Sequence, residues 1–481
     1  MNTHNRAAVT ILSVLILATI ASLLFAGPLT PPVGPIAPTP GPEPRIAINA
    51  TNTPGDADSL FKITQPGSYY LAGNITGVAG KHGIEITSSG VTLDLNGFDL
   101  VGTPGMAAFD GVSVTVDSLR GITVLNGSVR NWGDGGVDLG FLSRGCRVEG
   151  VLASGNTGTG ITASISANVT NCTSSFNGQR GIRASNGSTI SHCSVESNTG
   201  AGIEVNHGCS ISNCSAYFNT GPGMLTGVGC TVIDSSFYQN TSHGLQLGDG
   251  AVATQCTANL NSGRGISAAD SCAIRACTTT FNTLGGIIGG KGVSVTDCTA
   301  RSNPGDGIVV AENGTISNCR AANNGGSGVI AGVASTVDSC TSQLNDNIGI
   351  ELNLGGTVTN CSAKSNATHG IETSGSCIVR GNTCSQNGAA GIGAGIRVYA
   401  TDTRLENNNC ISNDYGIQVT VGGNFIVGNT CSNNSVHNWS LSIDNYYGPI
   451  IDRTLVVTPS VLGAAAPGTL NSTDPNANFS Y

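Results

Sequence analysis

A repeat of 21 residues runs through most of this chain of 481 residues. Three kinds of residue keep the period: a glycine followed by an aliphatic residue, an asparagine, and a cysteine. The glycines are Gly160, Gly181, Gly202, Gly223, Gly244, Gly265, Gly286, Gly307, Gly328, Gly349, Gly370 and Gly391. The asparagines run from Asn156 to Asn387 without a gap, and nine cysteines lie between Cys172 and Cys361 with Ser235 as the one substitution. A period held this long is typical of a solenoid, in which each repeat forms one turn.

The repeat unit has room for two or three short β segments and none for a helix. In a coil of parallel strands, residue i lies on residue i+21 at the inter-strand spacing of about 4.8 Å. Stacked asparagines then form a ladder of side-chain amides, the cysteines fill the interior as small apolar groups, and glycine supplies a backbone conformation that other residues resist. We therefore predict an all-β fold, a right-handed parallel β-helix with 21-residue coils.

Leucine-rich repeats are the nearest alternative architecture. The stretch Ile316-x-x-Cys319-x-Ala321-x-x-Asn324 fits their consensus frame. Those repeats need leucine at the core positions, where this chain has cysteine, alanine and serine with glycine-rich connections. The sequence therefore favours the β-helix.

The N-terminal segment is typical of an exported protein. Residues 1–26 have the layout of a signal peptide with cleavage after Ala26, and the alternative is an uncleaved membrane anchor. Residues 27–45 are a proline-rich linker that we expect to be a semi-rigid spacer. No later segment is long and apolar enough to cross a membrane. The net charge of −9 excludes nucleic acid as the partner, because phosphate binding needs clustered Lys and Arg.

Four further stretches carry a resemblance to a known family. They are VTLDLNGFDLVG (91–102), GITVLNGSVRNWGDGGVDL (121–139), FKITQPGSYYLAGNITG (61–77) and DPNANFSY (474–481). In these stretches the chain resembles secreted right-handed β-helix proteins of the pectin-lyase-like superfamily, over residues 46–481. The resemblance implies a strand-rich N-terminal cap with the first rungs at 46–110, β-helix repeats at 111–438 and an irregular C-terminal cap at 439–481. This superfamily includes lyases, hydrolases and non-catalytic binders, so the activity has to be argued from sites.

Two acidic positions are candidates for catalysis. Glu351 and Glu372 occupy the same position of adjacent repeats, so we expect their Cα atoms about 4.8 Å apart. Such a pair raises one pKa or recruits a cation such as calcium, and it suits a retaining glycosidase, whose carboxyl groups stand about 5–5.5 Å apart. The alternative is two exposed glutamates that point into water. Asp306 is a third candidate, although it shares its position with Arg180, His243, Arg264 and His369, which is typical of a solvated turn; we expect His369 to be exposed there.

Two tyrosines and the cysteines complete the set of predictions. Tyr217 and Tyr238 stack in one column and are candidates for binding a carbohydrate ligand. We expect most of the 17 cysteines to be free thiols, because in-register side chains point in parallel and give poor disulfide geometry. If any cysteines form disulfides, we expect them in a second, less regular column. Its members are Cys146, Cys209, Cys230, Cys272 and Cys377.

Two functions are consistent with these observations. The first is a non-catalytic exported scaffold, secreted or on the cell surface, that presents a long β face to a polysaccharide or cell-surface glycan. The second is a polysaccharide lyase or glycoside hydrolase with a divergent acidic site. An enzyme should bring charged residues together on three successive rungs of one column, and the repeat aligns only two, Glu351 and Glu372. The sequence therefore favours the scaffold; it predicts no metal site, and calcium is the one cofactor considered.

Overall fold

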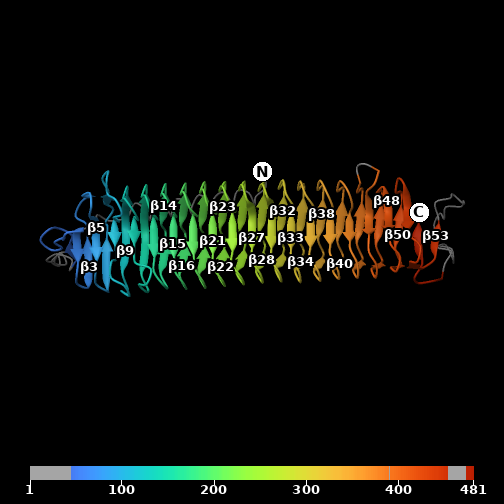
Figure 1. Ribbon diagram of the computed structural model, residues 1–481, viewed down its shortest axis with the longest axis horizontal. Coiled ribbons are helices and arrows are strands. Elements are labelled where there is room, and N and C mark those ends of the chain that lie inside the picture. Colours follow the sequence, from blue (N-terminus) through green and yellow to red (C-terminus); the bar gives the residue numbers. More distant parts are fainter. Residues whose placement is uncertain (1–44, 389–390, 453–472) are drawn as a thin grey trace, which may run out of the picture. The chain divides into compact units, whose positions relative to one another are not determined.

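The computed structural model describes residues 45–388, 391–452 and 473–481. Within these ranges the regular secondary structure consists of short strands joined by turns, and the solenoid comprises Ile46–Tyr481 (Figure 1). Neighbouring strands pair in parallel with partners one repeat apart, as in Ile182↔Ile203 and Ile190↔Ile211. The predicted all-β parallel β-helix is confirmed. The predicted signal peptide (1–26) and most of the linker (27–45) lie outside the described residues, among which no helix has the length and hydropathy to cross a membrane.

Each turn of the solenoid contributes one strand to each of three faces. Face 1 is formed by β2 (Ser59–Ile63), β5 (His82–Ile86), β8 (Val112–Ser113), β10 (Val137–Asp138), β12 (Ile161–Ala163), β15 (Ile182–Ala184), β18 (Ile203–Val205), β21 (Met224–Thr226), β24 (Leu245–Leu247), β27 (Arg264–Ala268), β30 (Gly285–Gly289), β33 (Ile308–Val310), β36 (Val329–Ala331), β39 (Ile350–Leu352), β42 (Ile371–Thr373), β45 (Ala394–Val398), β48 (Tyr415–Val419) and β51 (His437–Leu441).

Face 2 is formed by β1 (Ile46–Ala47), β3 (Gly67–Tyr70), β6 (Val91–Asp94), β13 (Asn168–Thr170), β16 (Thr189–Ser191), β19 (Ser210–Ser212), β22 (Thr231–Ile233), β25 (Val252–Thr254), β28 (Ala273–Arg275), β31 (Ser294–Thr296), β34 (Thr315–Ser317), β37 (Thr336–Asp338), β40 (Thr357–Thr359), β43 (Ile378–Arg380), β46 (Arg404–Glu406), β49 (Phe425–Val427) and β52 (Tyr446–Tyr447).

Face 3 is formed by β4 (Ile75–Thr76), β7 (Asp99–Val101), β14 (Thr173–Ser175), β17 (Ser194–Glu196), β20 (Ser215–Tyr217), β23 (Ser236–Tyr238), β26 (Thr257–Asn259), β29 (Thr278–Thr280), β32 (Thr299–Arg301), β35 (Arg320–Ala322), β38 (Thr341–Gln343), β41 (Ser362–Lys364), β44 (Thr383–Ser385), β47 (Asn409–Ile411), β50 (Thr430–Ser432), β53 (Ile450–Asp452) and β54 (Asn478–Ser480). Two longer strands, β9 (Thr123–Arg130) and β11 (Arg147–Ser154), run through both face 2 and face 3.

The asparagine ladder lies in the turn between face 3 and face 1, and its members are buried. Asn282 is typical. Its Nδ2 donates to the carbonyl oxygen of Ala258 at 2.9 Å and to Asn303 Oδ1 at 3.1 Å, while its Oδ1 accepts from Nδ2 of Asn261 at 2.9 Å. Each rung thereby satisfies the polar groups of its neighbours, which keeps a column of buried amides from destabilising the fold.

The cysteines are interior thiols, as predicted. All 17 are free and buried, including Cys146, Cys209, Cys230, Cys272 and Cys377, so the expectation of disulfides in that second column is wrong. The thiols instead bond to backbone carbonyls; Cys298 Sγ, for example, contacts the carbonyl oxygen of Thr296 at 3.2 Å. Stacked side chains that point the same way make this local bond while their Cβ vectors disfavour a disulfide.

The glycine column exists because there is no room for a side chain. The prediction that these glycines supply a special backbone conformation is wrong. Of its members from Gly160 to Gly370, none has a positive φ. A Cβ built on Gly349 would lie 2.5 Å from both Nδ2 of Asn366 and the carbonyl oxygen of Gly370. The asparagine ladder and the next rung therefore leave no room for a side chain. The left-handed conformation falls instead on corner residues such as Asn171, with φ of 54°.

The 21-residue period, regular from Asn156 to Asn387, is interrupted near residue 390. Ile371 pairs with Ile396, which is 25 residues further on, and Ile392 is 66% exposed. The expected twelfth pair, Gly391–Ile392, is therefore not part of the column, and Gly395–Ile396 takes its place. Asn387 still lies on Asn366, so the extra residues fall in the sequence between Asn387 and Gly395. This shift changes which residues meet on face 1.

Candidate functional site

One outward position of each face-1 strand forms a continuous column, named here the face-1 column. Strand pairing defines its members as Lys62, Glu85, Ser113, Asp138, Thr162, Arg183, Glu204, Leu225, Gln246, Ser267, Ile288, Val309, Ile330, Glu351, Glu372, Arg397, Gln418 and Ser440. The stretch from Leu225 to Ile330 is uncharged, and charged residues gather on both sides of it. We name the two charged groups the N-terminal centre and the C-terminal centre.

The C-terminal centre consists of Glu351, Glu372, Arg397 and His369. Glu351 pairs with Glu372 across β39 and β42, which is the adjacency expected from the repeat. Arg397 follows on β45, and its Nη1 lies 2.8 Å from Glu372 Oε2. Three charged residues thus occupy successive rungs, where the sequence indicated two. Arg397 escaped prediction because the inserted residues place it 25 positions after Glu372 instead of 21.

His369 is buried, with 9% of its surface exposed, so its assignment to an exposed turn is wrong. Its Nδ1 accepts a hydrogen bond from the backbone N–H of Ala394 at 3.0 Å. In the neutral imidazole the proton then resides on Nε2, which lies 3.4 Å from Glu372 Oε2. Burial lowers the pKa of His369, and the neighbouring Arg397 acts in the same direction against the opposing effect of Glu372. The side chain is covered because it bonds to the next rung.

The two carboxyl groups of this centre have different environments. Burial raises the pKa of Glu351 above its ordinary value, and the nearby charges of Glu372 and Asp306 raise it further. Glu372 instead faces the Arg397 guanidinium in a charge-assisted hydrogen bond. Two neighbouring carboxyl groups in such different environments can act as a proton donor and an anionic partner.

The other predicted site residues lie outside this centre. Asp306 is on a turn and its Oδ1 accepts the backbone N–H of Ser327 at 2.8 Å, so its contribution is the long-range effect on Glu351. Tyr217 and Tyr238 pair with each other as expected, but on face 3. The ring of Phe218 packs edge-on against both, with centroid distances of 5.7 Å and 5.9 Å. The three rings form an aromatic patch on another face than the glutamates.

The N-terminal centre consists of His82, Glu85, Asp110, Asp138 and Lys62, none of which the sequence analysis identified. Its signal was a tetrapeptide: His-Gly-Ile-Glu occurs at 82–85 and again at 369–372. The geometry repeats as well. His82 Nδ1 accepts the N–H of Asp110 on the next rung at 3.0 Å, and Lys62 Nζ lies 2.8 Å from Glu85 Oε2. Because Nδ1 is an acceptor and burial lowers the pKa of His82, its 3.5 Å approach to Asp110 Oδ2 is not an ion pair at neutral pH.

Asp110 is the most perturbed carboxyl group of this centre. It is 8% exposed; its Oδ1 accepts the N–H of Gly135 at 2.8 Å and its Oδ2 the hydroxyl of Ser113 at 3.0 Å. Burial, assisted by the charge of Asp138, raises the pKa of Asp110 to about 7. Burial also raises the pKa of Asp138, which lines a polar hollow of about 290 Å³ together with Asp134 and Arg183.

Asp110 should make the stability of the protein depend on pH. Its pKa is about 7 in the folded chain against an ordinary 3.8, so the folded state binds the proton more tightly and loses stability as pH rises through this window. We expect the contribution of this group to fall by about 2 kcal/mol between about pH 5 and about pH 7. Urea unfolding of wild type and Asp110→Asn across this range measures it. A difference between the two proteins that does not change with pH would contradict the assignment.

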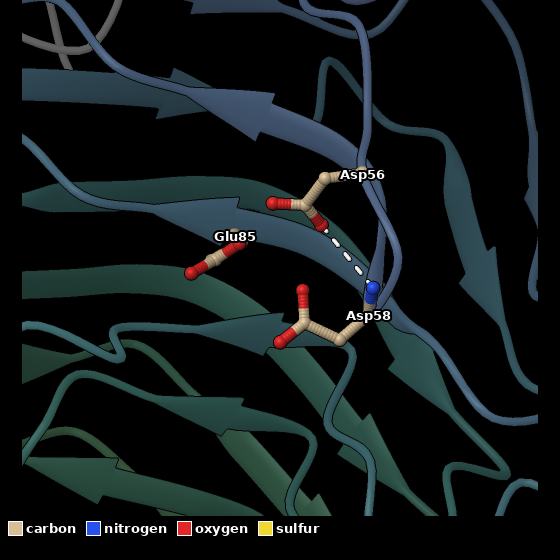
Figure 2. Close-up of side chains that lie close together, drawn as sticks. All are labelled: Asp56, Asp58 and Glu85. Atoms are coloured by element: carbon tan, nitrogen blue, oxygen red, sulfur yellow. Dashed lines mark hydrogen bonds between the residues drawn. The ribbon is translucent and has the colours of Figure 1, made fainter.

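Three carboxylates near the N-terminal centre, Asp56, Asp58 and Glu85, point toward a common space (Figure 2). One oxygen atom of each carboxylate lies within 4.8 Å of those of the other two. Lys62 Nζ, however, lies 2.6 Å from Asp56 Oδ2 and 2.8 Å from Glu85 Oε2. A side-chain cation therefore already contacts two of these three carboxylates, as Arg397 contacts Glu372 at the other centre. Calcium stays a prediction.

Comparison with known proteins identifies the family. The family model described as "Right handed beta helix region" matches residues 70–216 and 286–436, more than half of the chain. The chain belongs to the right-handed β-helix family. No curated protein matches the sequence of this β-helix protein.

Solved structures similar to this β-helix protein share little sequence with it. The Dettilon tailspike protein is 15% identical with a TM-score of 0.36, covering 53% of this chain and 58% of its own. The Agl-KA catalytic domain is 12% identical with a TM-score of 0.36, covering 60% and 59%. The pectate lyase Pel9A is 14% identical with a TM-score of 0.23, covering 71% and 72%. This chain thus spans less than two thirds of the first two structures, and none of the three transfers an activity to it.

Proposed function

We propose that this protein is an exported or cell-surface β-helix that binds an extended glycan along face 1. The face-1 column supports the proposal. It is a flat, parallel row of outward side chains with hydrogen-bonding charged groups on both sides of an uncharged stretch. Such a row matches a linear polymer of hydroxyl-rich units better than a compact ligand, which needs a concave pocket.

A neutral glycan fits this chain better than a polyanionic one. The net charge is −9, and the carboxyl groups of the face-1 column would meet an acidic polymer with like charge. Carboxylates such as Glu372 accept hydrogen bonds, and sugar hydroxyl groups donate them. The aromatic patch of Tyr217, Phe218 and Tyr238 is a candidate for a further sugar contact on face 3.

Hydrolysis of the bound glycan is the second candidate function. It is favoured by the different environments of Glu351 and Glu372 on adjacent rungs. In this reaction Glu351 would give its proton to the leaving glycosidic oxygen while the Glu372 carboxylate faces the anomeric carbon. Water then supplies the hydroxyl group of the released sugar and returns the proton to Glu351. Arg397 would keep Glu372 in position.

The double variant Glu351→Gln/Glu372→Gln tests both functions. We expect binding to β-glucan, xylan or mannan to weaken about 10-fold, and any hydrolysis to fall at least about 100-fold because the proton donor is lost. Binding is measured by calorimetry and release of reducing ends by a sugar assay, each with calcium and with a chelator.

Glu312→Gln is the matched control, because Glu312 is exposed and pairs with Lys291 away from the face-1 column. Unchanged binding and unchanged turnover in the double variant would remove the C-terminal centre from the function. Loss of binding in wild type on adding the chelator would show that calcium takes part.

A further inference from the structure

The two centres of face 1 are built alike, although they lie far apart along the chain. Each contains the sequence His-Gly-Ile-Glu, and in each the histidine Nδ1 accepts the backbone N–H of the next rung at 3.0 Å. In each, the glutamate lies 2.8 Å from a cationic nitrogen on a neighbouring rung of the same column, Lys62 for Glu85 and Arg397 for Glu372. Each centre also holds a second carboxyl group of the column, Asp138 two rungs from Glu85 and Glu351 one rung from Glu372.

The residues of the two centres follow one another in opposite order along the column. Lys62 lies one rung before Glu85, whereas Arg397 lies one rung after Glu372. The cations therefore occupy the outer ends of the arrangement, and the second carboxyl groups lie on the inner sides. From β5 to β42 the sheet makes thirteen strand-to-strand steps, which is about 62 Å at about 4.8 Å per step (Figure 1).

A third histidine in the middle of the face shows that the structural bond alone does not require the glutamate. His243 Nδ1 accepts the N–H of Arg264 at 3.0 Å, as the other two histidines do with their own neighbours. The residue three positions later, however, is Gln246, and no charged residue follows in the column until Glu351. The carboxylates of the column thus lie toward its two ends, and the rungs from Leu225 to Ile330 lack them.

We propose that the N-terminal centre is a second glycan-binding site and that one long neutral glycan engages both centres at once. This inference rests on the proposed function of face 1 and adds a requirement for chain length. A chain that spans about 62 Å makes its second contact intramolecularly, which raises affinity by a factor of about 10² to 10⁴ over either contact alone. A short oligosaccharide reaches one centre only and binds weakly. The straight stack of strands holds the centres in fixed register, so a stiff extended chain fits better than a coiled one.

The test is the dependence of affinity on glycan length. Size-fractionated β-glucan, xylan and mannan, from short oligosaccharides to chains longer than the span, are titrated into the full-length protein by calorimetry. For wild type we expect the affinity for one of these three glycans to rise at least about 100-fold once its chain is longer than the distance between the centres.

Two variants should remove that rise while keeping the weak binding of short chains: His82→Ala/Glu85→Gln and His369→Ala/Glu372→Gln. His243→Ala is the control, because it removes the same structural hydrogen bond in the middle of the face and should keep the rise. Circular dichroism checks that each variant folds; where a double variant does not, Glu85→Gln or Glu372→Gln alone replaces it.

The outcomes separate the two proposals. Short chains that bind with no gain at greater length, or a gain that survives the loss of the N-terminal centre, would overturn the two-centre inference and leave glycan binding by face 1 in place. A loss of the gain in His243→Ala as large as in the centre variants would also overturn it, because the effect would then be structural. No binding by wild type at any length would overturn the neutral-glycan function and the inference with it.

Discussion

Replacing Asn282 by alanine is expected to lower the free energy of unfolding by about 3–5 kcal/mol. The side chain is fully buried and bonds in two directions along the ladder. Its removal leaves the N–H of Asn261 without its acceptor and the carbonyl oxygen of Ala258 without its side-chain donor. Asn261 Nδ2 and Asn303 Oδ1 each lose one of two partners. Buried polar groups that lose their partner cost more than the hydrogen bond itself contributes, so the effect should exceed that of an ordinary cavity.

Urea unfolding followed by circular dichroism measures the loss. Asn347→Ala is the matched control: Asn347 is exposed and receives a side-chain bond from Thr368 at 3.3 Å, so its loss should cost less than about 0.5 kcal/mol. Equal unfolding midpoints for the two variants would contradict the view that the ladder stabilises the solenoid.

Replacing Gly349 by alanine is expected to lower the free energy of unfolding by about 3 kcal/mol. The new Cβ would lie 2.5 Å from Nδ2 of Asn366 and from the carbonyl oxygen of Gly370. The second of these is backbone of the next rung and cannot turn aside as a flexible side chain does. The rung has to move, and the ladder bond between Asn366 and Asn387 weakens with it.

Gly250→Ala separates the effect of space from that of conformation. Gly250 has a positive φ of 62° and open space around the position of a Cβ, so alanine there meets backbone strain and no contact. We expect a loss of about 1 kcal/mol. A larger loss at Gly250 than at Gly349, measured in the same urea unfolding experiment, would show that conformation and not space decides the glycine column.

The part of the site that could be predicted follows the exact repeat. Glu351 and Glu372 are 21 residues apart in an unbroken stretch of the period, so their adjacency follows from the sequence. Arg397 lies beyond the inserted residues, which place it 25 positions after its partner Glu372. The burial of His369 depends on a hydrogen bond to Ala394, which is also beyond the insertion.

The N-terminal centre could not be assembled from the repeat, because the first rungs have unequal lengths. Glu85 pairs with Ser113 and Ser113 with Asp138, which are steps of 28 and 25 residues in turn. With no fixed period, the sequence does not say which polar residues share a column. The recurrence of His-Gly-Ile-Glu at 82–85 and 369–372 was the one available sign.

The sequence by itself determined the solenoid, its buried ladders and the pairing of residues within the regular repeats. The physical reason is that a constant period places like residues on one another at the inter-strand spacing, where amides bond to amides and thiols and aliphatic side chains fill the interior. The tertiary structure decided the composition of the two charged centres. Loops of unequal length leave the sheet and return to it, and only the folded chain shows that Arg397 meets Glu372 and that Asp110 is buried beside His82.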